Sequence, residues 1–140
     1  MKEVQPIRDT KKIDAMKSIM KGESNYRDLL LFVLGINTGL RISDILALKW
    51  KSFISGGGRL LKAGDQLNVV EIKTKKVKSF VINRSVAEAL KLYHDSLANV
   101  SPDDPVFSSR KTDDGSLQPI TRIAAWQMLN RYADMVGLDE

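Results

Sequence analysis

The sequence predicts an α+β fold, mainly helical, with a small antiparallel sheet of three strands. Apolar residues recur at helical spacing towards both ends of the chain, whereas residues 59–82 contain three short runs rich in Val, Ile, Leu and Phe. The 140 residues are 43% apolar and 28% charged, which is typical of one globular domain. We therefore expect residues 1–140 to form a single domain in which helices precede and follow the sheet.

Three helices are expected before the sheet. The first spans residues 9–21, and its apolar face comprises Ile13, Met16, Ile19 and Met20. The second is apolar on every side over residues 29–34, which is typical of a helix at the centre of a core, and Gly39 is expected to take a left-handed conformation at its end. A short third helix carries Ile45, Leu46 and Leu48.

The three expected strands are residues 59–62, 67–72 and 77–82. Glycines at 56–58 end the helical pattern ahead of them, and Thr74, Lys75 and Lys76 occupy the turn between the last two strands. This arrangement predicts a hairpin with lysines at its tip.

Two further helices follow the sheet, separated by a loop-like segment at residues 99–120 that has room for a short strand at 106–107. The first has an apolar face made of Val86, Leu90, Tyr93 and Leu97. The face of the second comprises Ile123, Trp126, Leu129, Ala133 and Val136. The residues expected to cap helices at their N-termini are Asn25 or Ser24, Ser43, Ser85 with Glu88 in a capping box, and Thr121.

Composition excludes several kinds of site. The chain has no cysteine and a single histidine, His94, so a disulfide scaffold, a thiolate zinc site and a multi-histidine metal centre are excluded. The longest apolar run, residues 29–35, is too short to span a bilayer, and no signal-peptide pattern opens the sequence. We expect a soluble cytoplasmic protein with no metal, no small-molecule cofactor and no membrane partner.

Positive charge is concentrated in one stretch. The net charge is +5, and residues 49–84 contain 9 basic residues against 2 acidic ones. Such a stretch is typical of a protein that binds a polyanion, although a solubilising lysine-rich surface has the same composition.

Arg41 stands between the end of the buried helix and the start of the next one. A guanidinium held there on rigid backbone suits a phosphate or another oxyanion. The alternative is that Arg41 only pairs with Asp44 or caps the preceding carbonyl groups.

The residues around Arg41 resemble a known motif. Residues 38–44 read Thr-Gly-Leu-Arg-Ile-Ser-Asp, and Leu46, Leu48 and Trp50 follow at alternate positions. This pattern is similar to the first conserved box of the tyrosine recombinases, the phage integrase family. A lysine, a turn and a strand ending in an apolar triplet follow in residues 73–82, which resembles the second signature of the family.

The resemblance implies a DNA breaking and rejoining fold and a mechanism. In the family, a tyrosine attacks a DNA phosphate, forms a 3′-phosphotyrosyl bond and releases a 5′-hydroxyl, without metal or nucleotide. Arg41 would then clamp the scissile phosphate, Asp44 would support the site, and Lys73 would act as general acid, with Lys75 as the alternative. The residues expected to contact the DNA backbone are Lys49, Lys75, Lys76 and Lys78. At least two of the four hairpin lysines, Lys73, Lys75, Lys76 and Lys78, are expected to be merely solvated.

A complete catalytic domain of the family continues into a histidine-x-x-arginine box, a further histidine or tryptophan, and the nucleophilic tyrosine. His94 has no arginine three places later, so we interpret it as structural. Tyr26, Tyr93 and Tyr132 lie within helical patterns and are interpreted as packing residues. We therefore expect a truncated catalytic domain with no nucleophile, lacking a preceding core-binding domain and the C-terminal histidine and tyrosine segment.

Three functions remain open. The first is the fragment of a prokaryotic or phage-encoded DNA integrase. It is expected to bind duplex DNA, to self-associate on DNA in the full-length parent, and to act in the cytoplasm near the nucleoid. The alternative is a non-catalytic nucleic-acid-binding module with a recombinase-like fold, and the third is an interaction domain. Arg41 in its box favours the first two. Trp50 and Trp126 could stack on bases, but their helical spacing favours the core.

Overall fold

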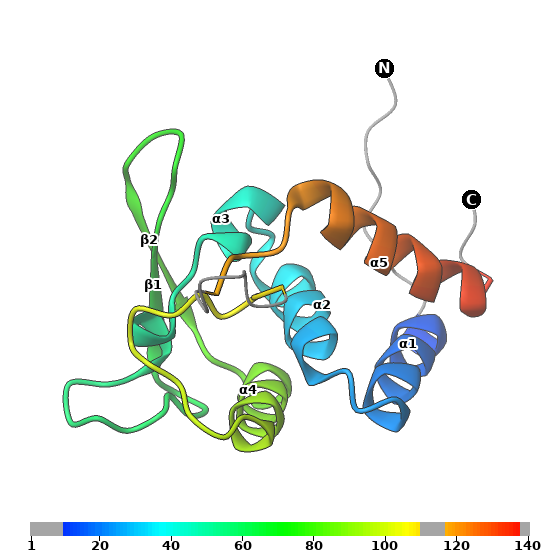
Figure 1. Cartoon of the computed structure of the whole chain (residues 1–140), viewed down its shortest axis with the longest axis horizontal. Helices are drawn as coiled ribbons and strands as arrows, with labels where there is room; N and C mark the ends of the chain where they lie inside the picture. Colours follow the sequence, from blue (N-terminus) through cyan, green and yellow to red (C-terminus); the bar gives the residue numbers. More distant parts are fainter. Residues whose placement is uncertain (1–9, 110–116, 138–140) are drawn as a thin grey trace.

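Figure 1 shows the computed structural model of the chain, which describes residues 10–109 and 117–137. In chain order the elements are α1 (Thr10–Gly22), α2 (Tyr26–Thr38), α3 (Ile42–Leu46), the 3-10 helix η1 (Trp50–Phe53), β1 (Gln66–Val70), β2 (Val77–Val81), α4 (Arg84–Ser96) and α5 (Arg122–Met135). Helices thus precede and follow a small antiparallel sheet, as predicted. The hairpin of β1 and β2 lies on the opposite side of the molecule from α1 (Figure 1).

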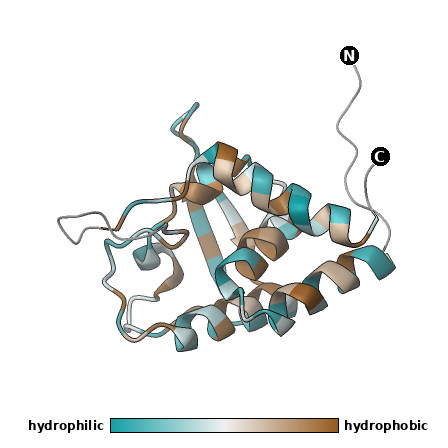
Figure 2. Cartoon of the chain, turned by 45° about the vertical axis from the view of Figure 1, so that its right-hand side comes forward, coloured by the Kyte–Doolittle hydropathy of each residue, from teal (hydrophilic) through white to brown (hydrophobic). Residues whose placement is uncertain are grey.

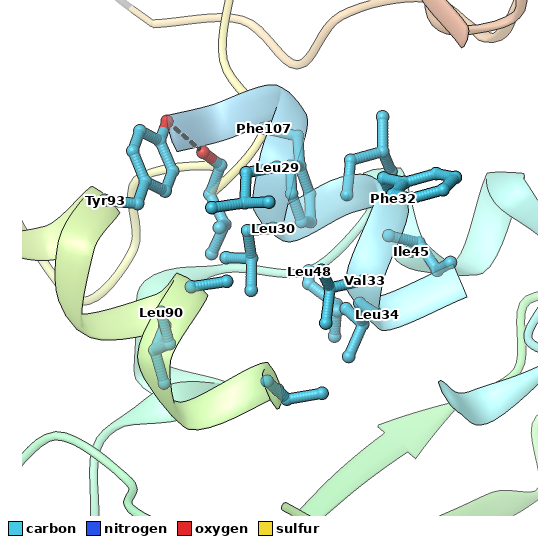
Figure 3. Close-up of a cluster of buried hydrophobic side chains, with 14 of the residues drawn as sticks. Leu29, Leu30, Phe32, Val33, Leu34, Ile45, Leu48, Leu90, Tyr93 and Phe107 are labelled. Carbon is cyan, nitrogen blue, oxygen red and sulfur yellow. Dashed lines mark hydrogen bonds between the residues drawn. The ribbon is translucent and has the colours of Figure 1, made fainter. Parts of the chain in front are cut away.

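Helix α2 forms the centre of the core. Residues 28–34 are all buried, and the helix packs against α1, α3, α4 and α5. Figure 3 shows its leucines and Phe32 clustered with Ile45 of α3, Leu90 of α4 and Phe107. Burial of each such side chain contributes about 1.5–3 kcal/mol. The helix ends at Gly39 with φ +67°, which confirms the predicted left-handed position.

The prediction of a third strand at residues 59–62 is wrong. Within the described residues, the sheet contains β1 and β2 only, and Leu60 makes a single isolated bridge with Ile54. Gly58 and Gly64 have positive φ angles, so the chain turns at both ends of this segment. The Asp65 carboxylate closes the loop by accepting from the Lys62 amide at 2.9 Å. The segment therefore has no room for a continuous ladder.

Residues 106–107 are buried but do not form a regular strand. The Val106 amide donates to the Leu48 carbonyl at 3.1 Å, and the Ile120 amide donates to the Phe107 carbonyl at 2.8 Å. Isolated bridges flank this pair on each side. The segment thus connects the end of α3 to the start of α5 without joining the sheet.

Two predicted caps are wrong. Arg41, not Ser43, is the N-cap of α3, because its carbonyl already accepts from the amides of Asp44 and Ile45. In α4 the cap is Asn83, whose side chain accepts from the Val86 amide at 2.9 Å. Ser85 instead accepts a hydrogen bond from Lys17, and Glu88 pairs with Lys21. The capping box therefore does not form: Asn83 caps the helix, and lysines of α1 bind the side chains of Ser85 and Glu88.

The other two caps differ in outcome. Thr121 caps α5 as predicted, since its hydroxyl accepts from the Ala124 amide at 3.1 Å. Asn25 occupies the N-cap position of α2, but its side chain makes no capping hydrogen bond. Its amide group instead donates to the hydroxyl of Tyr132 at 2.8 Å.

The predicted apolar face of α5 is correct only in part, because Leu129 and Val136 pack half-buried against the core. The helix buries Ala125, Met128 and Tyr132, whereas Ile123 and Trp126 are 70% and 50% exposed. The Tyr132 hydroxyl reaches polar groups at the corner between α1 and α2, and this requirement orients the helix. The core interpretation is therefore wrong for Trp126 and confirmed for Trp50, which is 2% exposed. Figure 2 shows hydrophilic and hydrophobic residues interspersed along the helices.

Candidate functional site

Arg41 lies at the exposed start of α3 with an extended backbone, φ −64° and ψ 144°. Its guanidinium makes no hydrogen bond or ion pair with any other described residue. Among the described residues it neither pairs with Asp44 nor caps a preceding carbonyl group, the two alternatives that the sequence left open. Because α3 has only five residues, its dipole is small, and the charge of Arg41 itself dominates at this position.

Asp44 connects α3 to the hairpin. It is 3% exposed, and its Oδ1 accepts a hydrogen bond from the Ile72 amide at 2.9 Å. Its Oδ2 is buried and has no hydrogen-bond partner among the described residues. The hydrogen bond joins residues 28 positions apart in the chain. It fixes the turn that carries Lys73 against the helix that carries Arg41.

The lysine turn spans residues 71–76, between β1 and β2. The strands pair in register from Gln66 with Val81 to Val70 with Val77. The Glu71 amide donates to the Lys76 carbonyl, and the Lys75 amide donates to the Glu71 carbonyl, both at 2.9 Å. The turn is therefore closed by two backbone hydrogen bonds.

The four hairpin lysines differ in their surroundings. Lys73, Lys75 and Lys76 are exposed, and their ammonium groups make no hydrogen bond or ion pair in the described part of the chain. Lys75 has φ +61°, a conformation that few residues other than glycine adopt. Lys78 instead pairs with Glu71 at 3.2 Å.

Lys49 lies apart from the hairpin, just before η1. It is exposed, and its backbone forms an isolated bridge with Pro105. The structure thus leaves Lys49 available to solvent, but nothing in it brings this side chain to the lysine turn.

Glu71 lies beside the candidate site, and the sequence patterns did not single it out. It is 9% exposed at the end of β1, and its carboxylate accepts from the Thr74 hydroxyl at 2.9 Å. This hydrogen bond and the nearby ammonium of Lys78 lower the pKa of the Glu71 carboxyl, and the charge of Arg41 acts in the same direction. The sequence signal was its position as the single acidic residue between Asp65 and Glu88.

The tyrosines have packing environments. Tyr132 is fully buried, Tyr93 is 6% exposed with its hydroxyl donating to the Val106 carbonyl at 2.6 Å, and Tyr26 is half-buried. Figure 3 shows the Tyr93 hydrogen bond at the edge of the core. Burial raises the pKa of the Tyr93 and Tyr132 phenols, which disfavours the phenolate.

His94 packs edge-on against Trp50, with ring centroids 5.4 Å apart. Across residues 10–109 and 117–137, no group of three His, Cys, Asp or Glu side chains is placed to hold a metal ion. No helix in those ranges is long and apolar enough to cross a membrane.

Comparison with known proteins agrees with the resemblance of the Arg41 box. A model of the phage integrase family matches residues 9–140, a range that includes the Arg41 box and the lysine hairpin. The chain is also 35% identical over 137 residues to the probable integrase/recombinase YoeC of Bacillus subtilis (strain 168), an alignment that covers 98% of this chain and 67% of that relative. The predicted relationship is thereby confirmed. Because both matches extend over nearly all of the 140 residues, the chain belongs to the phage integrase family, the tyrosine-type recombinases.

Proposed function

We propose that this chain binds duplex DNA and supplies the arginine and lysine of a recombinase active site. The observation that carries the proposal is the hydrogen bond from the Ile72 amide to Asp44, which holds the lysine turn against α3. Two exposed cations, Arg41 and Lys73, are thus positioned by one buried carboxylate and have no partner of their own among the described residues. A phosphodiester is a ligand that suits such a pair.

The chemistry assigned to these residues follows from the reaction. A tyrosine hydroxyl attacks the phosphorus and gives up its proton to solvent, a new O–P bond forms, and the bond to the 5′ oxygen breaks. Arg41 binds the non-bridging oxygens, on which negative charge develops. Lys73 donates a proton to the departing 5′ oxygen. Lys75 is kept as the alternative acid, since it is exposed in the same turn, with its backbone at φ +61°.

The nucleophile is proposed to lie outside these 140 residues. All three tyrosines are buried or half-buried, and the hydroxyls of Tyr93 and Tyr132 are committed to hydrogen bonds inside the domain. Self-association on DNA is part of the same proposal, since a tyrosine from elsewhere must reach the phosphate held by this chain. We keep the cytoplasm, near the nucleoid, as the expected place of action of a prokaryotic or phage-encoded protein.

DNA binding is tested by titrating labelled duplex at several salt concentrations. Arg41→Ala and Lys73→Ala should each weaken binding and reduce the slope of log K against log salt by about 0.9, the value for one lost phosphate contact. Lys91→Ala is the matched control, since Lys91 pairs with Asp95 on the surface of α4. Equal slopes for all four proteins would contradict the placement of phosphate at this site.

A non-catalytic binding module is the alternative function, and the burial of Tyr93 and Tyr132 is the observation that favours it. The two are separated by a chimera in which this chain replaces the matched segment of the Bacillus relative, with the unaltered relative assayed in parallel. A recombinase site predicts covalent DNA adducts that Arg41→Ala abolishes. A chimera that binds DNA but forms no adduct, beside an active relative, favours the binding module.

A further inference from the structure

Glu71 is a nearly buried carboxylate beneath a basic turn. Its Oε1 accepts from the Thr74 hydroxyl at 2.9 Å, and its Oε2 lies 3.2 Å from the Lys78 ammonium. Its pKa also responds to the charge of Arg41. One side chain thus contacts the turn that carries Lys73 and the strand β2 that follows it, and it lies within electrostatic range of Arg41.

The hydroxyl of Thr74 links the Glu71 carboxylate to the backbone of the turn. While it donates to Glu71, its oxygen accepts from the Lys76 amide at 3.2 Å. The Glu71 carboxylate therefore orients the hydroxyl so that a lone pair faces Lys76. Chains of hydrogen bonds of this kind reinforce one another in a partly buried setting.

The turn needs such support because it contains an unfavourable backbone conformation. Lys75 adopts φ +61°, which brings the Cβ of a residue with a side chain too close to the following carbonyl oxygen. The conformation persists only where its surroundings hold it. On one side of Lys75 the Thr74 hydroxyl donates to the Glu71 carboxylate, and on the other side the Lys76 amide donates to the Thr74 hydroxyl oxygen.

We propose that Glu71 is a positioning residue that holds the Lys73 turn in the geometry in which it meets a DNA phosphate. The inference rests on the proposed function of Lys73. It goes beyond that function because Glu71 acts through the turn and touches no phosphate. A carboxylate beside a DNA-binding surface would otherwise only repel DNA, and this difference in sign makes the proposal testable.

The key variant is Glu71→Leu, which raises the formal net charge of the chain from +5 to +6. If Glu71 only repels DNA, this change should tighten binding. If Glu71 positions the turn, binding should weaken despite the added charge. Asp95→Asn is the matched control, because it makes the same change in charge on α4, where Asp95 pairs with Lys91. It should leave DNA binding unchanged or slightly tighter.

Two additional variants separate positioning from folding. Glu71→Gln keeps an oxygen that can accept from Thr74, and Thr74→Val removes the hydroxyl but keeps the Glu71 charge. Amide hydrogen exchange is measured by NMR on the free 140-residue chain, together with its melting temperature. Glu71→Leu and Thr74→Val should speed exchange of the Lys75 and Lys76 amides about 10-fold or more, whereas Glu71→Gln should stay near wild type.

The link to Lys73 is measured with a double-mutant cycle in DNA affinity. Lys73→Ala should weaken DNA binding in the wild-type chain. It should have little further effect in Glu71→Leu, because a displaced Lys73 no longer contributes to DNA affinity. Additive losses would refute the positioning role. So would Glu71→Leu with unchanged exchange at Lys75 and Lys76, or with binding as tight as that of Asp95→Asn.

Failure of the proposed function gives a different result. If the wild-type chain binds no duplex DNA at low salt, the role of Lys73 on DNA and the positioning role built on it both fall. The exchange data would then still show whether Glu71 orders the turn. If the wild type binds DNA and the Glu71 variants behave as simple charge changes, only the present inference fails.

Discussion

Replacing Asp44 by alanine should free the lysine turn from α3 and destabilise the domain. Asp44 is 3% exposed, and its Oδ1 accepts from the Ile72 amide at 2.9 Å. Alanine leaves that partly buried N–H without its acceptor, which costs about 1–3 kcal/mol. In a domain of this length about 1 kcal/mol corresponds to about 3 °C, so we expect the melting temperature to fall by about 3–9 °C.

The assay is thermal unfolding followed by circular dichroism, with amide exchange at Ile72 as the local measurement. Asp44→Asn retains an oxygen that can accept from Ile72 and should recover most of the loss. Asp95→Ala removes an exposed carboxylate from α4 and should change stability by less than about 0.5 kcal/mol. If Asp44→Ala melts with the wild type and Ile72 exchanges no faster, the hydrogen bond does not hold the turn.

Three other comparisons test the fold. Gly39→Ala should destabilise the domain by about 1–2 kcal/mol because the backbone at Gly39 has φ +67°. Gly22→Ala should not, since the positive φ is absent there and a new Cβ meets no atom within 4 Å at either position. Chemical denaturation compares the two variants. Trp50 is 2% exposed, so Trp50→Ala should lower the free energy of unfolding by about 3–5 kcal/mol. Trp126 is 50% exposed, so Trp126→Ala should lower it by less than about 1 kcal/mol. Equal losses of stability would contradict the placement of α5. Burial raises the pKa of Tyr132, so the stabilisation from its neutral phenol is complete below pH about 10 and lost above it. Urea unfolding from pH 8 to 11 should therefore show the wild type losing stability relative to Tyr132→Phe.

The parts of the fold that the sequence predicted depend on local patterns. Residues 29–34 of helix α2 are apolar on all sides, so only a central position could bury them. Gly39 and Thr121 act within their own turns of the chain, and their roles follow from backbone geometry and a hydroxyl at the right spacing. The Arg41 box is likewise a contiguous motif, so those few residues are enough to indicate the family.

The parts that were missed depend on partners distant in sequence. Ser85 and Glu88 have the spacing of a capping box, yet lysines of α1 bind both side chains. The face of α5 is set by the Tyr132 hydroxyl, which reaches the corner of α1 and α2. The spacing of apolar residues predicts that the large side chains of α5 lie in the core. It does not indicate which distant residues form hydrogen bonds with the buried hydroxyl of Tyr132.

The two carboxylates under the basic surface show why composition alone could not define the site. Counted as charges, Asp44 and Glu71 oppose DNA binding. Their contacts give them another effect, since each accepts a hydrogen bond from the lysine turn, one from the Ile72 amide and one from the Thr74 hydroxyl. Negative charge held below the turn also offsets repulsion among its exposed cations before a phosphate arrives. A surface made of lysines alone would attract DNA equally in any conformation of the turn. It would not hold a particular lysine ammonium against a particular phosphate oxygen.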